Sequence, residues 1–428
     1  MERVIYHVDV NSAFLSWESC YRLYHLGGRL DLRQIPSAVC GDISLRHGIV
    51  LAKSMPAKAY GITTGMTVVE ARHRCPDLYM VPPNYTLYQK CSKALLQILQ
   101  EYTPKIEVFS IDEAFMDMTE TISLYGDPVS TADGLREKIR RELGFTVNIG
   151  ISSNKLLAKV AGDLKKPDLV HTLYDYEIPQ KMWPLPVSDL FFCGRASTKK
   201  LHTLGIRTIG ELAHTDVRIL RQHMKKQGET LWAYANGIDG SEVVAAEDSP
   251  PQKGYGNSTT ISFDVDDPAV AHKVLLALSE TVASRLREAH VKAETISVGI
   301  KSFDLKYAGH QMVLDDPTDI TEEIYRYACI LFEQLWDHKT PIRHLGLHTG
   351  RIKDGVTARQ MNLFDSTDYA KLARMNRAVD QIRRKYGIDA VKRAVFLGVQ
   401  ENGHKIDHLE GGISREKRSV DYTKQKID

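Results

Sequence analysis

Two short acidic segments, each at the end of an apolar run, constrain this chain most. Asp9 lies in the apolar run 4–10, and the pair Asp112 and Glu113 lies between two further apolar runs. Short apolar runs of this kind predict β-strands, so each carboxylate is expected at the tip of a strand. Taken singly, such residues are most often a solvated strand cap or an ordinary surface turn. Together they predict a site, because three carboxylates on one sheet edge would make a poor core.

Carboxylates gathered in this way suit Mg²⁺, since this cation prefers oxygen ligands. Two Mg²⁺ ions support in-line phosphoryl transfer, because one lowers the pKa of the attacking hydroxyl and the other holds the leaving phosphate. The backbone carbonyl of Val10 would supply one more oxygen ligand. We therefore predict that Asp9, Asp112 and Glu113 are catalytic and that they bind two Mg²⁺ ions together with Val10.

The apolar pattern of the first part of the chain predicts an α+β sheet with helices packed on one face. Strands are expected over residues 4–10, 106–110, 114–118 and 145–151. One helix is expected to have Asp133 at its start and Gly144 at its end, and a second helix to span residues 155–165. Residues 11–75 interrupt the sheet and predict a small inserted lobe.

The rest of the chain divides into further units. Residues 176–244 predict a compact helical domain, and residues 245–258 have the composition of a linker. A second α+β unit follows, with strands expected at 259–263, 295–303, 310–314 and 344–349 and helices at 268–288 and 321–336. Beyond residue 354 the pattern predicts one helix, over residues 371–386.

Three motifs, in this order along the chain, resemble the Y-family translesion DNA polymerases. The first is Asp9 with the aromatic Phe14 five positions later, and the second is the string from Ser110 to Ala114. The third is Gly150-Ile151-Ser152, followed by Asn154-Lys155 and Ala158-Lys159. The resemblance runs from residue 4 to about residue 350 and is closest to the bacterial UmuC-type branch.

The resemblance implies a right-hand, multidomain α+β fold. Residues 1–10 and 76–175 would form a ferredoxin-like palm, residues 11–75 small fingers and residues 176–244 a thumb that contains a helix-hairpin-helix. After the linker 245–258, residues 259–353 would form an α+β little finger and residues 354–428 a tail. The implied function is template-directed addition of dNTPs to a primer 3′-hydroxyl, with low fidelity and no proofreading, in tolerance of DNA damage.

The resemblance also implies residues that bind the incoming nucleotide. Phe14 holds the steric-gate position, where its ring would clash with a ribose 2′-hydroxyl, although a core aromatic is the alternative. Contacts to the dNTP are expected from Lys58, Lys166, Ser54, Lys53 and Ala13. Here the chain departs from the commonest pattern of the family. Met55 replaces a tyrosine, and Lys58 replaces an arginine fork with a point charge.

Basic residues in two regions are expected to contact DNA phosphates without reading sequence. In the helix-hairpin-helix they are Arg195, Lys199 and Lys200, and Gly194 and Gly205 would let backbone amides approach the same phosphates. The alternative for this segment is a plain αα-hairpin. In the second α+β unit they are Lys301, Lys306, Arg343 and Arg351, each of which could be an ordinary surface charge. The implied partners are therefore primer-template DNA and dNTPs, and the resemblance leaves room for an accessory subunit.

A pentapeptide beyond the last α+β unit resembles the peptide that docks into the bacterial sliding clamp. Gln360 would fix its orientation, and Leu363 and Phe364 would be the apolar anchors. The alternative is that these residues begin the following helix.

Composition is consistent with this interpretation but not diagnostic. The 428-residue chain has a net charge of only +2, so basic stretches matter more than the sum. Its six cysteines show no zinc spacing and no CxxC pair, and no apolar run is long enough for a membrane span, so a cytoplasmic protein is expected. Two other classes stay open: a catalytically silent scaffold in DNA repair, which intact carboxylates argue against, and a palm-type nucleotide cyclase, which the basic hairpin argues against.

Overall fold

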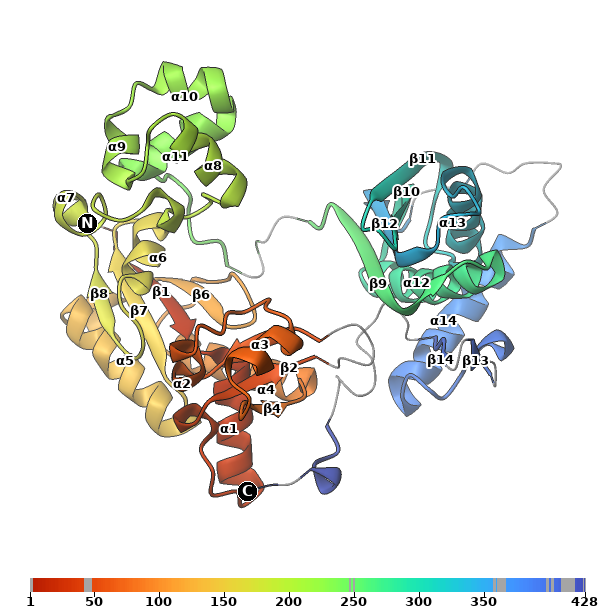
Figure 1. Cartoon of the computed structure of the whole chain (residues 1–428), viewed down its shortest axis with the longest axis horizontal. Coiled ribbons are helices and arrows are strands. Elements are labelled where there is room, and N and C mark those ends of the chain that lie inside the picture. The colour runs from red at the N-terminus through yellow and green to blue at the C-terminus, as the bar shows by residue number, and fades with distance from the viewer. Residues whose placement is uncertain are drawn as a thin grey trace.

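The computed structural model describes residues 3–41, 48–245, 248, 251–356, 359, 367–397, 400–401, 404–408, 420–425 and 427. Figure 1 shows two sheet-containing regions, with a group of short helices at the end of the first. We call the two regions the first and second sheet units, and the group of short helices the helical unit. Among the helices of the described residues, none combines the length and the apolar content that crossing a bilayer requires.

The first sheet unit is built on a five-stranded sheet with the order β5-β6-β1-β7-β8. Its strands are β1 (Ile5–Val10), β5 (Ile106–Val108), β6 (Glu113–Asp117), β7 (Val147–Ser152) and β8 (Val170–Thr172). The central strand β1 pairs antiparallel with both β6 and β7. The four predicted strands are confirmed, and β8 is a fifth that the apolar pattern did not predict.

Alternation along β1 divides the first sheet unit into two faces. Tyr6, Val8 and Val10 join the core formed with the helices of one face, which are α1 (Ala13–His25), α4 (Tyr85–Gln100) and α5 (Pro128–Leu143). His7 and Asp9 belong to the opposite face, where α6 (Lys155–Asp163) packs. The side chain of Asp9 is therefore on the face that α1, α4 and α5 leave open.

Helix α5 begins earlier than its sequence pattern predicts. Asp127, rather than Asp133, is the N-cap, and its carboxylate accepts a hydrogen bond from the backbone N–H of Ser130 at 2.8 Å. Pro128 follows at the first helical position, where its fixed φ and missing N–H cost nothing. The helix ends as predicted at Gly144, which has a φ of 77°.

A small three-stranded sheet forms the inserted lobe, but its boundaries differ from the expected 11 and 75. Its strands are β2 (Ser37–Cys40), β3 (Val50–Lys53) and β4 (Tyr79–Val81), in the order β3-β2-β4. Two short helices accompany them, α2 (Met55–Ala59) and α3 (Val68–Arg74). Strand β4 lies beyond the expected end of the lobe, and α1, expected inside it, packs on both the first sheet unit and the lobe.

The helical unit contains α7 (Ile178–Lys181), α8 (Arg195–Thr203), α9 (Ile209–His214), α10 (Val217–Met224) and α11 (Lys226–Ala235). Its apolar core includes Leu156, Leu157 and Val160 of α6. Helix α6 therefore packs on the first sheet with one side and on the helical unit with another.

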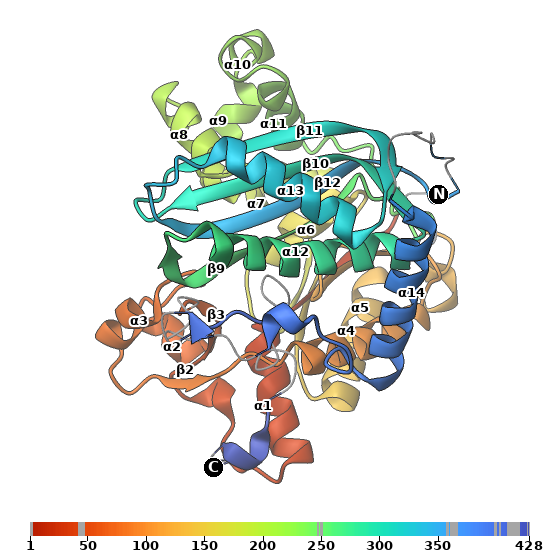
Figure 2. The same ribbon diagram turned by 90° about the vertical axis from the view of Figure 1, so that its right-hand side faces the viewer.

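The second sheet unit has four antiparallel strands in the order β11-β10-β12-β9. They are β9 (Gly254–Val265), β10 (Val291–Ser302), β11 (Tyr307–Thr318) and β12 (Ile342–Asp354). Helices α12 (Pro268–Glu288) and α13 (Thr321–Leu335) cover one face of this sheet (Figure 2). Because residues 254–258 already pair with β12, the linker is shorter than the expected 245–258.

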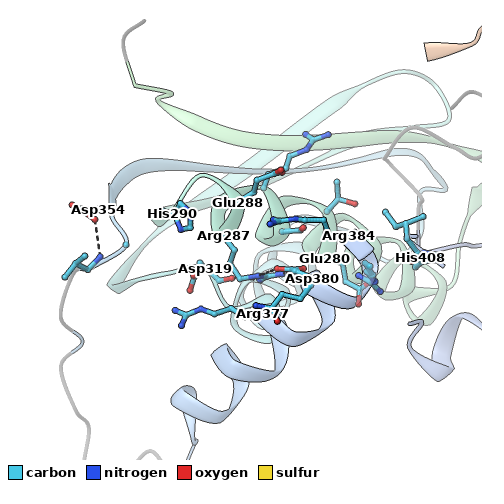
Figure 3. Close-up of a pocket in the computed structure, with 18 residues that line it drawn as sticks. Glu280, Arg287, Glu288, His290, Asp319, Asp354, Arg377, Asp380, Arg384 and His408 are labelled. Carbon is cyan, nitrogen blue, oxygen red and sulfur yellow. Dashed lines mark hydrogen bonds and ion pairs between the residues drawn. The ribbon is translucent and has the colours of Figure 1, made fainter. Parts of the chain in front are cut away.

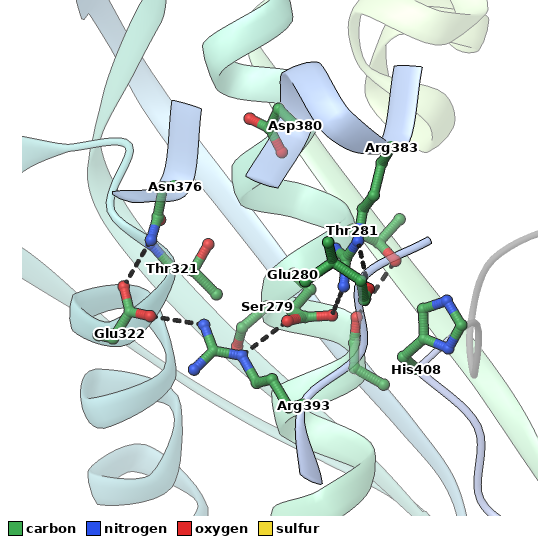
Figure 4. A network of polar contacts seen from close by, with 12 residues as sticks. Ser279, Glu280, Thr281, Thr321, Glu322, Asn376, Asp380, Arg383, Arg393 and His408 are labelled. Carbon is green, nitrogen blue, oxygen red and sulfur yellow. Dashed lines mark hydrogen bonds and ion pairs between the residues drawn. The ribbon is translucent and has the colours of Figure 1, made fainter. Parts of the chain in front are cut away.

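Helix α14 (Tyr369–Tyr386) docks on the second sheet unit through ion pairs. Arg383 and Arg393 both donate to Glu280 of α12, and Arg393 also donates to Glu322 of α13 (Figure 4). A cavity of about 730 Å³ between α12 and α14 lies beside these contacts and is lined by charged side chains (Figure 3). Beyond α14 the described residues include the two-residue strands β13 (Gln400–Glu401) and β14 (His404–Lys405).

Candidate active site

The backbone brings the three predicted carboxylate residues to one edge of the first sheet. Asp9 on β1 is directly opposite Glu113 on β6, and the N–H of Val10 donates to the carbonyl of Asp112 at 3.1 Å. Opposed residues of an antiparallel pair direct their side chains to the same face of a sheet. Asp9 and Glu113 therefore share the face that the apolar core of α1, α4 and α5 does not cover.

Glu113 is held as a carboxylate by two neighbours. Its Oε2 lies 3.2 Å from Nε2 of His7 and accepts a hydrogen bond from Nζ of Lys159 at 2.5 Å. Burial raises the pKa of Glu113, but these hydrogen bonds outweigh it and hold the pKa at about 2. Glu113 is therefore ionised throughout the range in which an enzyme works.

Asp9 has a different electrostatic setting. Only 8 % of the residue is exposed, and this burial raises its pKa despite an ion pair with Lys166. Lys166 contacts Asp163 as well, at 2.8 Å. Because a buried carboxylate is costly without compensation, this position favours a cation next to Asp9.

Asp112 differs from the other two carboxylates in having a hydroxyl neighbour. Oγ of Ser110 donates to its carboxylate at 2.6 Å, which closes the tight turn between β5 and β6. Among the described residues no cation forms an ion pair with Asp112. Its carboxylate is therefore the one of the three that a bound cation could approach without displacing a lysine.

The close approach of α6 to β7 places Lys159 beside Glu113. A Cβ on Gly150 would lie 2.0 Å from the carbonyl oxygen of Ala158, so a side chain there would push α6 away. Sequence reasoning included Lys159 in a motif but gave it no role, and it missed His7. The period-two alternation of β1 could have found His7, because it lies two residues before Asp9 on the same face.

The donor set suits Mg²⁺ in chemistry. It consists of carboxylate oxygens and a backbone carbonyl, the ligands that this hard cation prefers. Within the described part of the chain, no three acidic, histidine or cysteine side chains are close enough to hold a metal ion as they stand. Lys166 and Lys159 supply positive charge beside Asp9 and Glu113 instead. The residues therefore fit divalent cations once the lysine ammonium groups move aside.

The Phe14 ring belongs to an aromatic cluster at the start of α1. It stacks on Tyr88 of α4, with ring centroids 4.4 Å apart and planes at 6°, and meets the edge of Tyr85 at 5.9 Å. Trp17 lies 6.0 Å away on the same helix. Ala13 is the first residue of α1 and is buried. Packing on three sides gives the Phe14 ring little freedom to move.

The predicted triphosphate contacts of the small lobe separate into two groups. The pKa of Lys53 is lowered by burial and by the charge of Lys58, so the two ammonium groups are close enough to repel. An anion would relieve that repulsion. The hydroxyl of Ser54, in contrast, donates to Ile35 and accepts from two backbone N–H groups, which leaves it no further hydrogen-bonding capacity for a phosphate.

The helical unit presents its predicted DNA contacts to solvent. Gly194 is the N-cap of α8, and a Cβ there would meet nothing within 4 Å. Arg195 and Lys199 help to line an open hollow of about 710 Å³ beside it. Lys200 is exposed on the same helix, and Gly205, with a φ of 80°, turns the chain toward α9. Backbone N–H groups at a helix N-terminus, with cations on the same helix, are typical of phosphate binding.

The predicted DNA contacts in the second sheet unit differ from one another. Arg343 pairs with Asp264 at 3.0 Å, and Lys306 pairs with Asp304 at 2.8 Å. Lys301 is opposite His344 on the sheet face that the helices leave open, and Arg351 is exposed on β12. The predicted clamp contacts Gln360, Leu363 and Phe364 lie outside the described residues.

Comparisons with known proteins identify the family of this chain. The model of the impB/mucB/samB family matches residues 8–163, and that of its C-terminal domain matches residues 252–363. DNA polymerase IV of Clostridium acetobutylicum is 43% identical over 401 residues, which are 94% of this chain and 100% of the relative. DNA polymerase IV of Acetivibrio thermocellus is 39% identical, over 93% of this chain and 98% of the relative. The UmuC-type branch stays a prediction, because neither relative bears that name.

A solved structure supports the fold independently. A Y-family DNA polymerase chimera covers 82% of this chain and 99% of its own, with a TM-score of 0.70 and 21% identity. The fold and these relatives together define a nucleotidyltransferase of the right-hand, multidomain α+β type. The chain belongs to the impB/mucB/samB family, the Y family of translesion DNA polymerases.

Proposed function

We propose that this DNA-directed DNA polymerase adds dNTPs to a primer 3′-hydroxyl at the site formed by Asp9, Asp112 and Glu113, together with the carbonyl of Val10. The observation that carries the proposal is the direct pairing of Asp9 with Glu113, next to Asp112, on the sheet face opposite α1, α4 and α5. The relatives' name, DNA polymerase IV, supports the same substrates, which are primer-template DNA and dNTPs.

In this reaction the primer 3′-oxygen attacks the α-phosphorus of the dNTP, and pyrophosphate leaves. Two Mg²⁺ ions, when bound, lower the pKa of the 3′-hydroxyl and stabilise the charge of the leaving group. Asp9, Asp112 and Glu113 supply the oxygens that would hold them. Lys166, now on Asp9, would pass to a triphosphate oxygen when substrate binds, while Lys53 and Lys58 attract the same anion.

Primer extension with purified protein, Mg²⁺ and four dNTPs tests this proposal. Undamaged and abasic templates would be compared, with Asp112→Ala as the inactive control. Extension that disappears in the variant and on addition of EDTA is expected. Primed DNA that is bound but never extended would instead indicate a silent scaffold, and turnover of a single nucleotide without DNA would indicate a cyclase.

Phe14 is proposed as the steric gate against ribonucleotides. The support is its place five residues after Asp9 and its fixed ring, stacked on Tyr88. Phe14→Ala is expected to let ribonucleotides in while DNA synthesis continues. The measurement is the ratio of kcat/KM for a dNTP to that for the matching NTP. An unchanged ratio would remove the gate assignment.

The units take the family's roles in this proposal. The first sheet unit is the palm, the small lobe the fingers, the helical unit the thumb and the second sheet unit the little finger. The exposed cations Arg195, Lys199 and Lys200 would bind the duplex backbone, with Lys301 and Arg351 on the little finger. Arg343 and Lys306 could take part only by leaving their aspartates.

A sliding clamp is proposed as the partner of Gln360, Leu363 and Phe364. Support comes from their sequence and their place after the second sheet unit. Changing Leu363 and Phe364 to Ala is expected to abolish stimulation by the clamp and to leave unassisted synthesis intact. Stimulation that survives the change would contradict this.

The same assay would show whether the polymerase needs an accessory subunit. A cytoplasmic location is also proposed, because the six cysteines are free.

A further inference from the structure

The last described segment of the chain lies against α1. Residues 420–425 include a short 3₁₀ turn, Tyr422–Lys424, and both views place this turn near the end of α1 (Figures 1 and 2). The contacts join residues about 400 positions apart: Tyr422 reaches Glu18, and Gln425 reaches Arg22. Residues 420–425 therefore lie against the first sheet unit.

The hydroxyl of Tyr422 both donates and accepts a hydrogen bond in this contact. It donates to Oε2 of Glu18 at 2.9 Å and accepts from Nδ2 of Asn84 at 3.1 Å. Glu18 is 0% exposed and Asn84 is 6% exposed. A hydroxyl that donates to one buried side chain and accepts from another makes a specific contact. Without it, each buried partner would lose a hydrogen bond that water could not replace.

The segment also completes a buried ion pair on α1. Nε of Arg22 donates to Oε1 of Glu18 at 2.7 Å, and its Nη2 donates to Oε1 of Gln425 at 2.5 Å. The Tyr422 ring lies 5.3 Å from that of Tyr21 and 5.7 Å from the Arg22 guanidinium. A buried ion pair is stable only when its remaining polar atoms find partners, and here the segment supplies one to each member.

The same contacts lead to Phe14. Glu18 is one helical turn after Phe14 on α1. Asn84 is the N-cap of α4, whose Tyr85 and Tyr88 contact the Phe14 ring. Tyr422 therefore joins the two helices that hold this ring in place.

We propose that residues 420–425 are a docking segment for a receptor surface formed by Glu18, Arg22 and Asn84, and that Tyr422 is a positioning residue which fixes α1 and α4 around Phe14. Docking adds a non-covalent connection between the first sheet unit and the part of the chain beyond α14, in addition to the covalent connection through the intervening chain. The positioning role rests on the proposed gate function of Phe14, whereas the docking does not.

Hydrogen exchange of the full-length protein tests the docking. Tyr422→Ala removes ring and hydroxyl, Tyr422→Phe removes the hydroxyl alone, and Tyr386→Ala, at a residue 68% exposed on α14, is the matched control. Amides in the second half of α1 and at the start of α4 are expected to exchange about tenfold faster in Tyr422→Ala, and less so in Tyr422→Phe. Exchange identical to that of the control would overturn the proposal.

Sugar selectivity tests the positioning role. Tyr422→Phe is expected to raise ribonucleotide incorporation severalfold through the KM for the NTP, with kcat for dNTPs unchanged, since the reacting groups are intact. Unchanged selectivity, with faster exchange in α1, would overturn positioning and leave docking supported. Phe14→Ala run in parallel separates the two proposals, because failure of that variant to alter selectivity would remove the gate and leave the exchange result standing.

Discussion

Two groups of buried or half-buried acidic residues in this protein are neutralised by different cations. In the first sheet unit, lysines do it: Lys166 pairs with Asp9 and Lys159 with Glu113. Between the second sheet unit and α14, arginines do it. Arg287 binds Asp380 through two nitrogens, at 2.5 and 3.1 Å.

The choice of lysine or arginine distinguishes a substrate-binding site from a structural interface. We call the contacts between α14 and the second sheet unit the arginine interface. A guanidinium has a fixed fork of donors, and Arg287 uses it to reach the carbonyl of Asp319 and the side chains of Thr321 and Asn376 as well. Such a cation cannot leave without breaking several hydrogen bonds. An ammonium is a point charge on a flexible stem, so Lys166 can exchange Asp9 for another anion. Lysine suits the carboxylates that bind substrate, and arginine suits those that hold a helix.

The largest effect is expected when a carboxylate of the site loses its charge. Asp9→Asn keeps size and shape but removes a metal ligand, so primer extension should fall by about a thousandfold or more, roughly 4 kcal/mol in the barrier. Thermal unfolding is the matched measurement. Burial raises the pKa of Asp9, so its charge costs folding free energy, and the variant should melt no lower than the parent. A variant that unfolds would show that Asp9 has a structural role, and the contrast between the site and the arginine interface would then be wrong.

Much of the first sheet unit follows from the sequence, because its apolar runs are local signals. β1, β6 and β7 were predicted within a few residues, and with them the carboxylates at their ends. Errors arose where tertiary contacts decide. Strand β4 has only three residues and depends on pairing with β2, and the start of β9 depends on pairing with β12.

The cations of the site were harder to predict than its acids. Lys159 reaches Glu113 only because Gly150 lets α6 approach β7, which is a contact between elements rather than a pattern within one. Lys166 was predicted as a triphosphate contact, but its pairing with Asp9 was not. The contact between Tyr422 and Glu18 has no local signal, since it joins distant parts of the chain.

An intermediate effect is expected at the arginine interface. Arg287→Lys keeps the charge but cannot make the fork, so the docking of α14 should weaken by about 2–3 kcal/mol. Hydrogen exchange of α14 measures this directly. Arg384→Lys, on an exposed residue that lines the cavity shown in Figure 3, is the control and should leave exchange unchanged. Equal effects of the two changes would show that charge alone stabilises the docking of α14.

The smallest effect is expected at the same interface when the pH is lowered. Burial raises the pKa of Glu322, but hydrogen bonds from Arg393 and Asn376 outweigh it, so the folded-state pKa is lower than usual (Figure 4). A carboxylate of this kind stabilises the fold above its unfolded pKa of about 4.3 and loses that contribution as the pH falls through the folded value. Docking of α14 should therefore weaken by about 1 kcal/mol below pH 4. The melting temperatures of the parent and Glu322→Gln should converge there and differ at pH 7, and a constant gap across this range would assign the contact to shape rather than charge.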